Sequence, residues 1–287
     1  MQHRLPHLAQ RLFNVPLAIH PRKAEIVMAA LGDRFGVTHL FRAGALPAGA
    51  LADFEDDDTA GLYRPYSLLG GVAIIPIEGT LVMKLGTMRP FSGMCGYDGV
   101  RACLQQALSD PQVRAILLDV DSPGGEVAGC FDLADAIYSA RGEKPLWGIA
   151  DEMAYSAAYA LISSCDRVLT TRTGGVGSVG VIAMHVDMSQ ALSKAGLTPT
   201  LLTYGDQKAD GTETAPLPAD VKDRFMVDIN AMGELFVETV ARNRNMPASL
   251  VRDTQAGTFM GAAGVTVGFA DAVTTPQAAL AALQAVT

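Results

Sequence analysis

The sequence is poor in charge, and most of the charge that it carries is negative. Charged residues make up 18% of the 287 residues, and 30 acidic residues against 22 basic ones give a formal net charge of −8. Nucleic-acid binding requires a basic surface that neutralises phosphates, so no nucleic-acid partner is expected. Hydrophobic residues make up 49%, which is enough for a large buried core and excludes a wholly disordered chain.

Cysteines and long apolar runs are scarce as well. The four cysteines include no C-x-x-C pair, and Cys103, Cys130 and Cys165 have apolar neighbours. They are therefore expected to be small core side chains that do not require an oxidising compartment. No stretch approaches the roughly 18 apolar residues of a membrane span, and the first residues lack the apolar core of a signal peptide. We expect a cytoplasmic protein with no membrane span.

The distribution of charge and of glycine and proline suggests how the chain is organised. Residues 1–42 carry six basic and two acidic residues and four of the five histidines, which suggests an N-terminal basic arm with a short helix at 22–35. This arm is either a docking segment or an ordinary solvated helix face. Residues 43–70 are rich in glycine, alanine and proline and predict a linker. The main domain is expected at 71–275, followed by a C-terminal helix or tail at 276–287.

Within the main domain, short apolar runs alternate with helical patterns. The expected strands are 72–78, 114–120, 145–150, 167–170 and 179–185, and the expected helices are 99–108, 127–138, 153–165 and 219–242. This alternation predicts an α/β fold with a mostly parallel sheet.

A glycine pair stands where one of these strands meets the next helix, in Ser-Pro-Gly-Gly-Glu at 122–126. Without a Cβ, the backbone N–H groups of paired glycines can approach a ligand closely. The following helix directs its positive end to the same place. Such a loop can bind a phosphate, a carboxylate or a developing oxyanion, or it can be a plain tight turn.

A serine occupies the corresponding position after another strand, in Ala-Tyr-Ser-Ala-Ala-Tyr at 154–159. Ser156 is flanked by small residues, so its hydroxyl is accessible, and the N–H of Ala157 points in the same direction. A nucleophile elbow places its serine at the same kind of strand-to-helix turn, although the glycines usual in that motif are absent here. The alternative is an ordinary N-cap serine.

A serine hydroxyl is a weak nucleophile and requires a base. The main domain contains one histidine, His185, and a competing candidate is Lys208 in a polar loop at 205–218. A lysine can serve as a base when burial removes its proton near neutral pH, although a loop lysine is usually solvated. The sequence shows neither a cluster of metal ligands nor a G-x-x-x-x-G-K-[ST] loop, so no metal and no cofactor are expected.

Four motifs follow one another in a fixed order. They are Asp-Val-Asp-Ser-Pro-Gly-Gly at 119–125, Ala-Tyr-Ser-Ala-Ala-Tyr at 154–159, Gly-Gly-Val-Gly-Ser-Val-Gly-Val at 174–181 and Thr-Tyr-Gly-Asp-Gln-Lys at 203–208. Together with the stretch at 258–273, they resemble the motifs of the S49 peptidases, the signal peptide peptidase A group, which has the ClpP/crotonase fold. The resemblance extends over residues 71–273.

The resemblance implies a role for each matching residue. It makes Ser156 the nucleophile of a serine peptidase, Lys208 its general base, and the N–H group of Gly125 an oxyanion donor together with that of Ala157. Ser178 is our candidate for a hydroxyl that orients Lys208. His185 remains the alternative base.

The N-terminal Arg-Leu-Phe-Asn-Val-Pro-Leu-Ala-Ile-His-Pro at 11–21 resembles the tailed-phage branch of this family, the capsid maturation proteases. This implies a homo-oligomer that cleaves a capsid, portal or scaffold protein in the host cytoplasm or in the procapsid. Two alternatives stay open: a non-catalytic capsid assembly or scaffolding protein, and a crotonase-like acyl-CoA enzyme.

Overall fold

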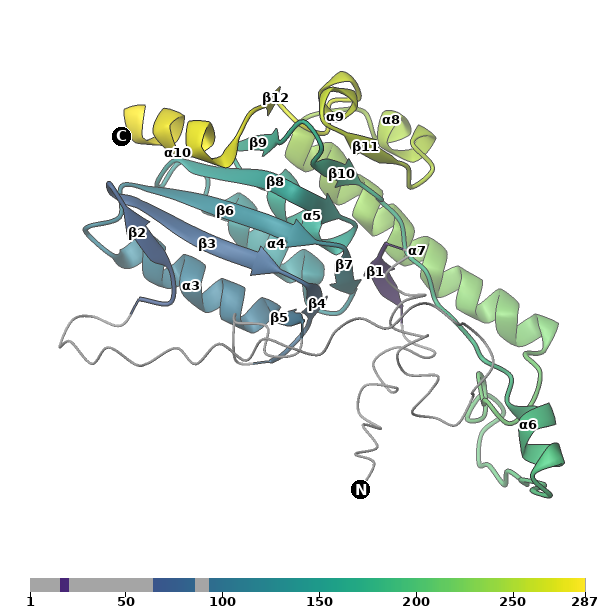
Figure 1. The fold of residues 1–287 in the computed structure, drawn as a ribbon. Coiled ribbons are helices and arrows are strands. Elements are labelled where there is room, and N and C mark those ends of the chain that lie inside the picture. Colours follow the sequence, from purple (N-terminus) through teal and green to yellow (C-terminus); the bar gives the residue numbers. More distant parts are fainter. Residues whose placement is uncertain (1–15, 21–63, 86–92, 287) are drawn as a thin grey trace.

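A computed structural model describes residues 16–20, 64–85 and 93–286. Two sheets form the centre of the molecule, one of eight strands and one of four (Figure 1). The strands are β1 (Leu17–Ile19), β2 (Ser67–Leu69), β3 (Val72–Glu78), β4 (Thr80–Val82), β5 (Met94–Gly96), β6 (Ala115–Ser122), β7 (Gly124–Glu126), β8 (Leu146–Tyr155), β9 (Arg167–Thr170), β10 (Gly175–Gly177), β11 (Thr258–Met260) and β12 (Ala272–Val273). The helices are α3 (Tyr97–Ser109), α4 (Cys130–Ser139), α5 (Ala157–Ser163), α6 (Ser189–Lys194), α7 (Ala219–Arg244), α8 (Ala248–Asp253), α9 (Ala262–Thr266) and α10 (Pro276–Ala285).

The large sheet has the order β11-β10-β8-β6-β3-β2, with β9 paired to β8 and β12 paired to β9. Its central strands β3, β6 and β8 run parallel, and antiparallel pairing occurs where β2 and β11 join its margins. The α/β class with a mostly parallel sheet, expected from the sequence, is confirmed. The carboxyl ends of β3, β6 and β8 consequently lie along one edge, which is where parallel sheets carry their ligand sites.

Both faces of the central strands are covered, and this explains their apolar sequences. Alternate residues of β6 point to opposite faces. Ile116, Leu118 and Val120 belong to the main core, whereas Ala115 and Leu117 belong to a smaller core that includes residues of α10. Figure 1 shows α3, α4 and α5 on one face of the sheet and α10 on the other.

Strand β8 has two partners along the same side. Residues 147–150 pair with β9, and residues 153–155 pair with β10. The strand is therefore held along its whole length and continues to Tyr155, directly before helix α5. The expected helix at 153–165 is wrong in its first residues, because pairing with β10 keeps 153–155 in the sheet.

The small sheet has the order β1-β7-β4-β5. Strand β7 contains the glycine pair at 124–125 and follows β6 after a single residue. The sequence motif at 122–126 is therefore a short strand at the carboxyl edge of the large sheet rather than a simple turn.

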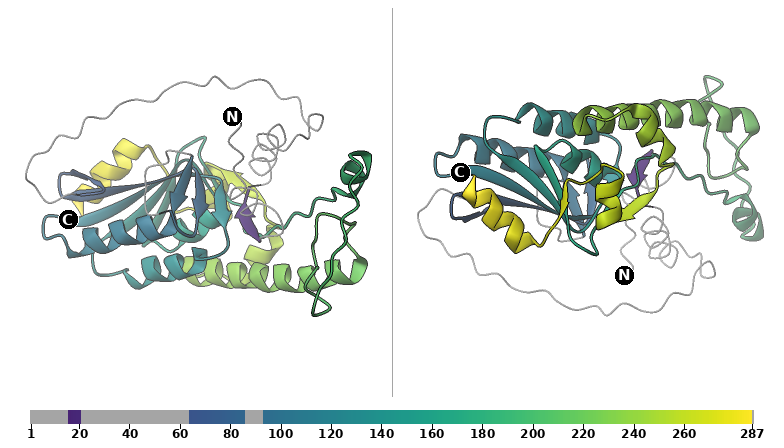
Figure 2. Two further views of the ribbon diagram at one scale, coloured as in Figure 1. Left: turned by 90° about the horizontal axis from the view of Figure 1, so that it is seen from below. Right: turned by 90° about the horizontal axis from the view of Figure 1, so that it is seen from above.

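An arm extends from this body, formed by residues 186–218 and the N-terminal half of α7 (Figures 1 and 2). The C-terminal half of α7 packs on the body through Phe236, Val237 and Val240. The segment joining α6 to α7 lies at the far end of the arm and exposes Leu197, Leu201, Leu202 and Tyr204.

Other expectations are corrected by the structure. Residues 67–69, assigned to the linker, form β2 because they pair with β3. Residues 179–185, expected to be a strand, pair with the described part of the chain only through one bridge at Ile182. Residues 17–19, assigned to a basic helical arm, form β1. The helix expected at 22–35 lies outside the described residues, and within the C-terminal segment expected at 276–287 the structure forms helix α10.

Strand β6 places one carboxylate in an unfavourable environment. Desolvation raises the pKa of Asp119 to about 6, and the nearby charges of Asp151, Glu78 and Asp121 add to the shift. Its Oδ1 atom is buried without a hydrogen-bond partner in the described part of the chain. Because the folded state holds this proton more tightly than the unfolded chain, Asp119 stabilises the fold below about pH 4, and this stabilisation is lost as the pH rises through 6.

We predict that Asp119→Asn increases the free energy of unfolding at pH 7.5 by up to about 1 kcal/mol, after allowance for solvent screening. The advantage over the wild type should shrink towards pH 4.5. Urea unfolding of both proteins at the two pH values measures this difference. The matched control is Asp253→Asn at an exposed position, and an advantage of Asp119→Asn that does not change with pH would contradict the assignment.

Candidate active site

Ser156 stands at the junction of β8 and α5 in a strained backbone conformation. Its φ is 55° and its ψ is −121°, a region that L-residues with a side chain rarely adopt. Its N–H donates to the carbonyl of Gly177 at 2.8 Å, and its own carbonyl accepts from the N–H of Ala160 at 3.0 Å. Strand β10 on one side and helix α5 on the other therefore hold the turn in place.

The chain adopts this conformation a second time, at Gly261, with φ 50° and ψ −119° before helix α9. There the residue is glycine, which enters this region without a steric penalty. At 156 the chain keeps a serine in spite of a cost of about 1–3 kcal/mol. The comparison within one molecule indicates that the side chain at 156 is retained for its hydroxyl.

The hydroxyl of Ser156 lies inside the protein. Its Oγ donates to the carbonyl of Gly180 at 3.4 Å, which is a weak contact, and the residue is 1% exposed. The weak bond leaves the hydroxyl largely uncommitted, and within the described residues no charged side chain is hydrogen-bonded to it.

Strand β7 lies directly against Ser156. Gly124 has φ +99°, and a Cβ placed on it would lie 2.9 Å from the Cβ of Ser156. A Cβ on Gly125 would overlap the carbonyl of Leu81 in β4. Both glycines are therefore required by close packing. Gly125 and Ala157, the two predicted oxyanion donors, flank Ser156, and Ala157 is the first residue of α5, whose N–H has no partner within the helix.

Ser178 also lies close to this junction. It directly follows Gly177, whose carbonyl holds Ser156, and its own N–H donates to the carbonyl of Gly257 at 2.8 Å. Ser178 is buried and has a positive φ of 58°. The predicted supporting serine is thus brought next to the predicted nucleophile.

Lys208 does not lie near Ser156. It lies in the exposed segment that joins α6 to α7, at the far end of the arm, and its N–H donates to the carbonyl of Gly205 at 3.2 Å. Within the described residues, its ammonium group makes no hydrogen bond or ion pair. In this arrangement a single chain brings together the hydroxyl of Ser156 and the predicted oxyanion donors, while the predicted base is exposed to solvent.

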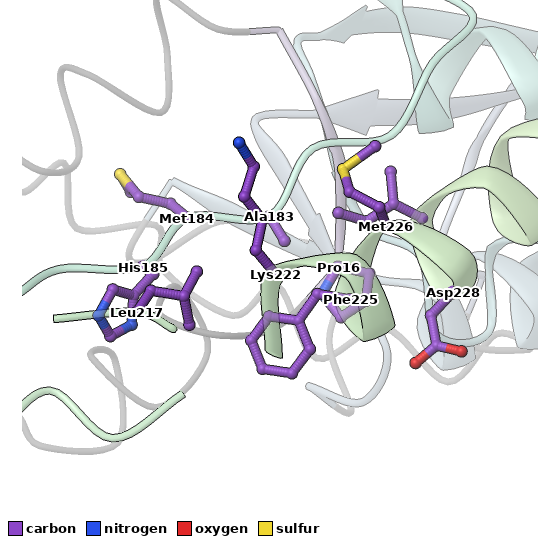
Figure 3. Close-up of a pocket in the computed structure, with 10 residues that line it drawn as sticks. Pro16, Ala183, Met184, His185, Leu217, Lys222, Phe225, Met226 and Asp228 are labelled. Atoms are coloured by element: carbon purple, nitrogen blue, oxygen red, sulfur yellow. The ribbon is translucent and has the colours of Figure 1, made fainter. Parts of the chain in front are cut away.

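His185, the alternative base, lies at a pocket of about 280 Å³ at the root of the arm (Figure 3). The pocket is bordered by Pro16, Phe225, Lys222 and Asp228, among others. Both ring nitrogens of His185 are buried without a hydrogen-bond partner in the described chain, and the hydroxyl of Ser156 donates to Gly180 instead.

One component of the site was missed by the sequence analysis. Strand β1 runs antiparallel to β7, with Leu17 opposite Glu126, Ala18 opposite Gly125 and Ile19 opposite Gly124. On its other side, Leu17 and Ile182 exchange both main-chain hydrogen bonds, at 2.8 and 2.9 Å. The segment thus lies between the glycine loop and the chain that follows Ser178. A run of three apolar residues carries no signal for such a distant pairing.

The described part of the chain lacks two other kinds of site. Nowhere in it do three side chains of histidine, cysteine, aspartate or glutamate gather in a way that could hold a metal ion. None of the helices that it contains has the length and apolarity to cross a membrane.

Comparison with known proteins identifies the family. The sequence model of Peptidase family S49 matches residues 139–286, just over half of the chain. The chain belongs to peptidase family S49. The matched region of this S49 chain includes Ser156, Ser178 and Lys208, and the recognition made from the motifs is thereby confirmed.

Two curated relatives are similar over almost the whole S49 chain. The head-tail preconnector protein GP5 of Enterobacteria phage P21 is 42% identical, and the alignment covers 94% of this chain and 55% of the relative. The capsid assembly protease C of Escherichia phage lambda is 39% identical, with 93% of this chain and 62% of the relative covered. The chain therefore spans less than two thirds of the length of either relative.

Among solved structures, a point mutant of ClpP1 from Listeria monocytogenes is similar with a TM-score of 0.44 and 11% identity. The match covers 72% of this chain and 94% of that one.

The strain at Ser156 in this S49 chain leads to a stability prediction. Ser156→Gly should be more stable than Ser156→Ala by about 1 kcal/mol, because glycine relieves the backbone conformation whereas alanine keeps its Cβ. Thermal and urea unfolding of both variants measures the difference.

Ser109, an exposed residue of helix α3, provides the control. At that position the order should reverse, with alanine more stable than glycine. If Ser156→Gly is the less stable of the two variants at 156, the turn is not strained in the way described.

Proposed function

We propose that the protein is a serine endopeptidase in which Ser156 is the nucleophile and Lys208 the general base, and that it acts in the maturation of a phage or prophage capsid. The single observation that carries this proposal is the strained turn at Ser156, placed against the glycines of β7. Membership of family S49 supports the same chemistry.

The proposed reaction uses main-chain donors for most of its catalytic power. The hydroxyl of Ser156 attacks a peptide carbonyl and passes its proton to the neutral amine of Lys208. The N–H groups of Gly125 and Ala157 stabilise the oxyanion, each contributing on the order of 3 kcal/mol. Lys208 then protonates the leaving amine, and a water molecule that it deprotonates releases the acyl group from Ser156.

Lys208 must reach Ser156 for this reaction, and we propose that the arm of a second copy delivers it. Helix α7 is continuous over 26 residues, and its C-terminal half is anchored in the body. Folding the arm back onto its own Ser156 would require this helix to break. A second copy could instead receive the arm as it is, and would cover its exposed apolar side chains, of which Leu202 is 94% exposed.

Such an interface would also supply the burial that the chemistry needs. Lys208 is exposed in the single chain, whereas the reaction requires its neutral amine. Enclosing it among apolar side chains disfavours the charged ammonium relative to the neutral amine. In this proposal, assembly both positions Lys208 and favours the neutral amine that can accept the proton of Ser156.

The names of the relatives support a capsid role. One is a capsid assembly protease and the other a head-tail preconnector protein. We therefore propose a capsid, portal or scaffold protein as the substrate, in the host cytoplasm or in the procapsid. The strained serine and the family match favour a hydrolase over the scaffolding protein and the crotonase-like enzyme.

Single substitutions test the two catalytic roles. Ser156→Ala and Lys208→Ala should each reduce cleavage of coexpressed capsid and scaffold proteins by about 10³–10⁶-fold, because the two groups act as a unit. His185→Ala should retain cleavage. Mass spectrometry of the coexpressed proteins measures the products. Loss of cleavage with His185→Ala together with retention in Lys208→Ala would assign the base to His185, and retention in Ser156→Ala would end the peptidase proposal.

Mixing the two inactive variants tests delivery of the lysine by a second copy. An equimolar mixture of Ser156→Ala and Lys208→Ala should regain about a quarter of the wild-type activity, because sites that combine an intact serine with a neighbour's intact lysine then form. Ser156→Ala mixed with the double variant is the control and should stay inactive. A mixture of the single variants without activity would place both groups in one chain.

A further inference from the structure

Strand β1 occupies a slot that is hydrogen-bonded on both sides. On one side, the N–H of His20 donates to the carbonyl of Pro123 at 2.7 Å. On the other side, Leu17 exchanges two bonds with Ile182. The strand thus closes the gap between β7 and the segment after Ser178, as an added peptide strand does in β-augmentation.

The register places Ala18 at the oxyanion loop. Antiparallel ladders alternate between hydrogen-bonded and non-hydrogen-bonded pairs. The bond from His20 to Pro123 and the bond from Val127 to Pro16 mark two hydrogen-bonded positions. Ala18 and Gly125 lie midway between them and belong to the same type, so the carbonyl of Ala18 faces the N–H of Gly125.

Ala18 is also close to the serine. A Cβ placed on Gly124 would contact the carbonyl oxygen of Ala18 on one side and lie 2.9 Å from the Cβ of Ser156 on the other. The peptide group that follows Ala18 therefore stands where an S49 enzyme of the proposed mechanism would hold the bond to be cleaved. Leu17 and Ile19 are 4% exposed and Ala18 and Ser156 no more than 1%, so the strand shuts the nucleophile off from solvent.

We infer that residues 16–20 are a built-in pseudosubstrate: they fill the peptide slot of the same chain and block it until a substrate strand replaces them. The inference rests on the proposed function, because it assigns the slot beside Ser156 to the substrate. The class of competing ligand is an extended polypeptide. Its main chain can repeat the bonds to β7 and Ile182, and at the position of Ala18 the slot accepts a small side chain.

The contacts of β1 indicate a strand that another peptide can displace rather than a permanent part of the small sheet. Its hydrogen bonds to both neighbours are main-chain bonds, which any extended peptide can form. Moreover, Pro16 borders the pocket at the root of the arm together with Phe225 of α7 (Figure 3). The start of the strand therefore borders the same pocket as the element that would have to engage a second copy in the proposed mechanism.

The experiment measures access to position 156 without relying on peptidase activity. In full-length Ser156→Cys, alkylation by iodoacetamide is followed by mass spectrometry with peptide mapping. The background is low because the four native cysteines are buried. Adding Ala18→Glu, which places a charge in the slot, should accelerate alkylation of Cys at 156 by at least about tenfold, since labelling follows the population of the open state.

Two further measurements distinguish opening of the slot from misfolding of the Ala18→Glu protein. Ala18→Gly is a mild change and should accelerate alkylation by about two- to fivefold, because glycine weakens a strand without adding bulk. A synthetic peptide with the sequence of residues 14–22 should slow the alkylation of the Ala18→Glu protein again by refilling the slot. Ala281→Glu and Ala281→Gly, at an exposed position of α10, are the matched controls and should leave the rate unchanged.

The outcomes separate this inference from the proposed function. Equal alkylation rates for the Ala18 and Ala281 variants, or a peptide without effect, would overturn the pseudosubstrate. So would a wild-type chain cut within residues 16–20 that stays intact in Ser156→Ala, because the strand would then be a substrate. Faster alkylation in the Ala18 variants without any detectable cleavage by the wild type would support the blocking strand and count against the peptidase instead.

Discussion

The backbone at Ser156 is the constraint from which the rest of the site follows. A φ of 55° at a serine persists because the surrounding structure fixes both of its peptide groups. Ser156 directly follows strand β8 of the large sheet. Its N–H donates to the carbonyl of Gly177, and its carbonyl accepts from the N–H of Ala160 in the first turn of α5. Because the neighbouring strand β6 runs parallel to β8 and ends beside it, the glycine loop reaches the same place.

The site formed in this way is almost entirely main chain. The N–H groups of Gly125 and Ala157 flank the serine, and no charged side chain is hydrogen-bonded to its hydroxyl in the described chain. Such a site can stabilise a developing oxyanion at little cost in reorganisation, because peptide dipoles fixed by the sheet and the helix do not have to move. What it lacks is a proton acceptor. In the proposed mechanism this missing proton acceptor is supplied from outside the body, which makes catalysis depend on assembly.

The parts of this arrangement that the sequence could predict are those encoded by neighbouring residues. Buried strands such as β6 show as apolar runs, and the glycine pair and Ser156 stand at strand ends that such runs reveal. The position of Lys208 could not be predicted, because a polar loop contains no information on where a long helix will carry it. Strand β1 could not be predicted either. It is three residues long, and its register depends on partners more than 100 residues away.

The two features that the sequence could not predict, the position of Lys208 and strand β1, both concern the hydroxyl of Ser156. In the proposed mechanism, the place of Lys208 far out on the arm leaves Ser156 without its base, and the proposed blocking strand β1 leaves it without room for a substrate. A protease that is made together with its own structural proteins would benefit from both, because each holds the reaction back while the chain is alone. The pocket at the root of the arm, bordered by Pro16 and Phe225, joins the two features physically. If binding of a second copy shifts α7 at this pocket, the same movement that brings in a lysine would also disturb the contacts of Pro16 at the start of β1. Release of β1 from the slot and arrival of Lys208 at Ser156 would then be coupled in a single equilibrium.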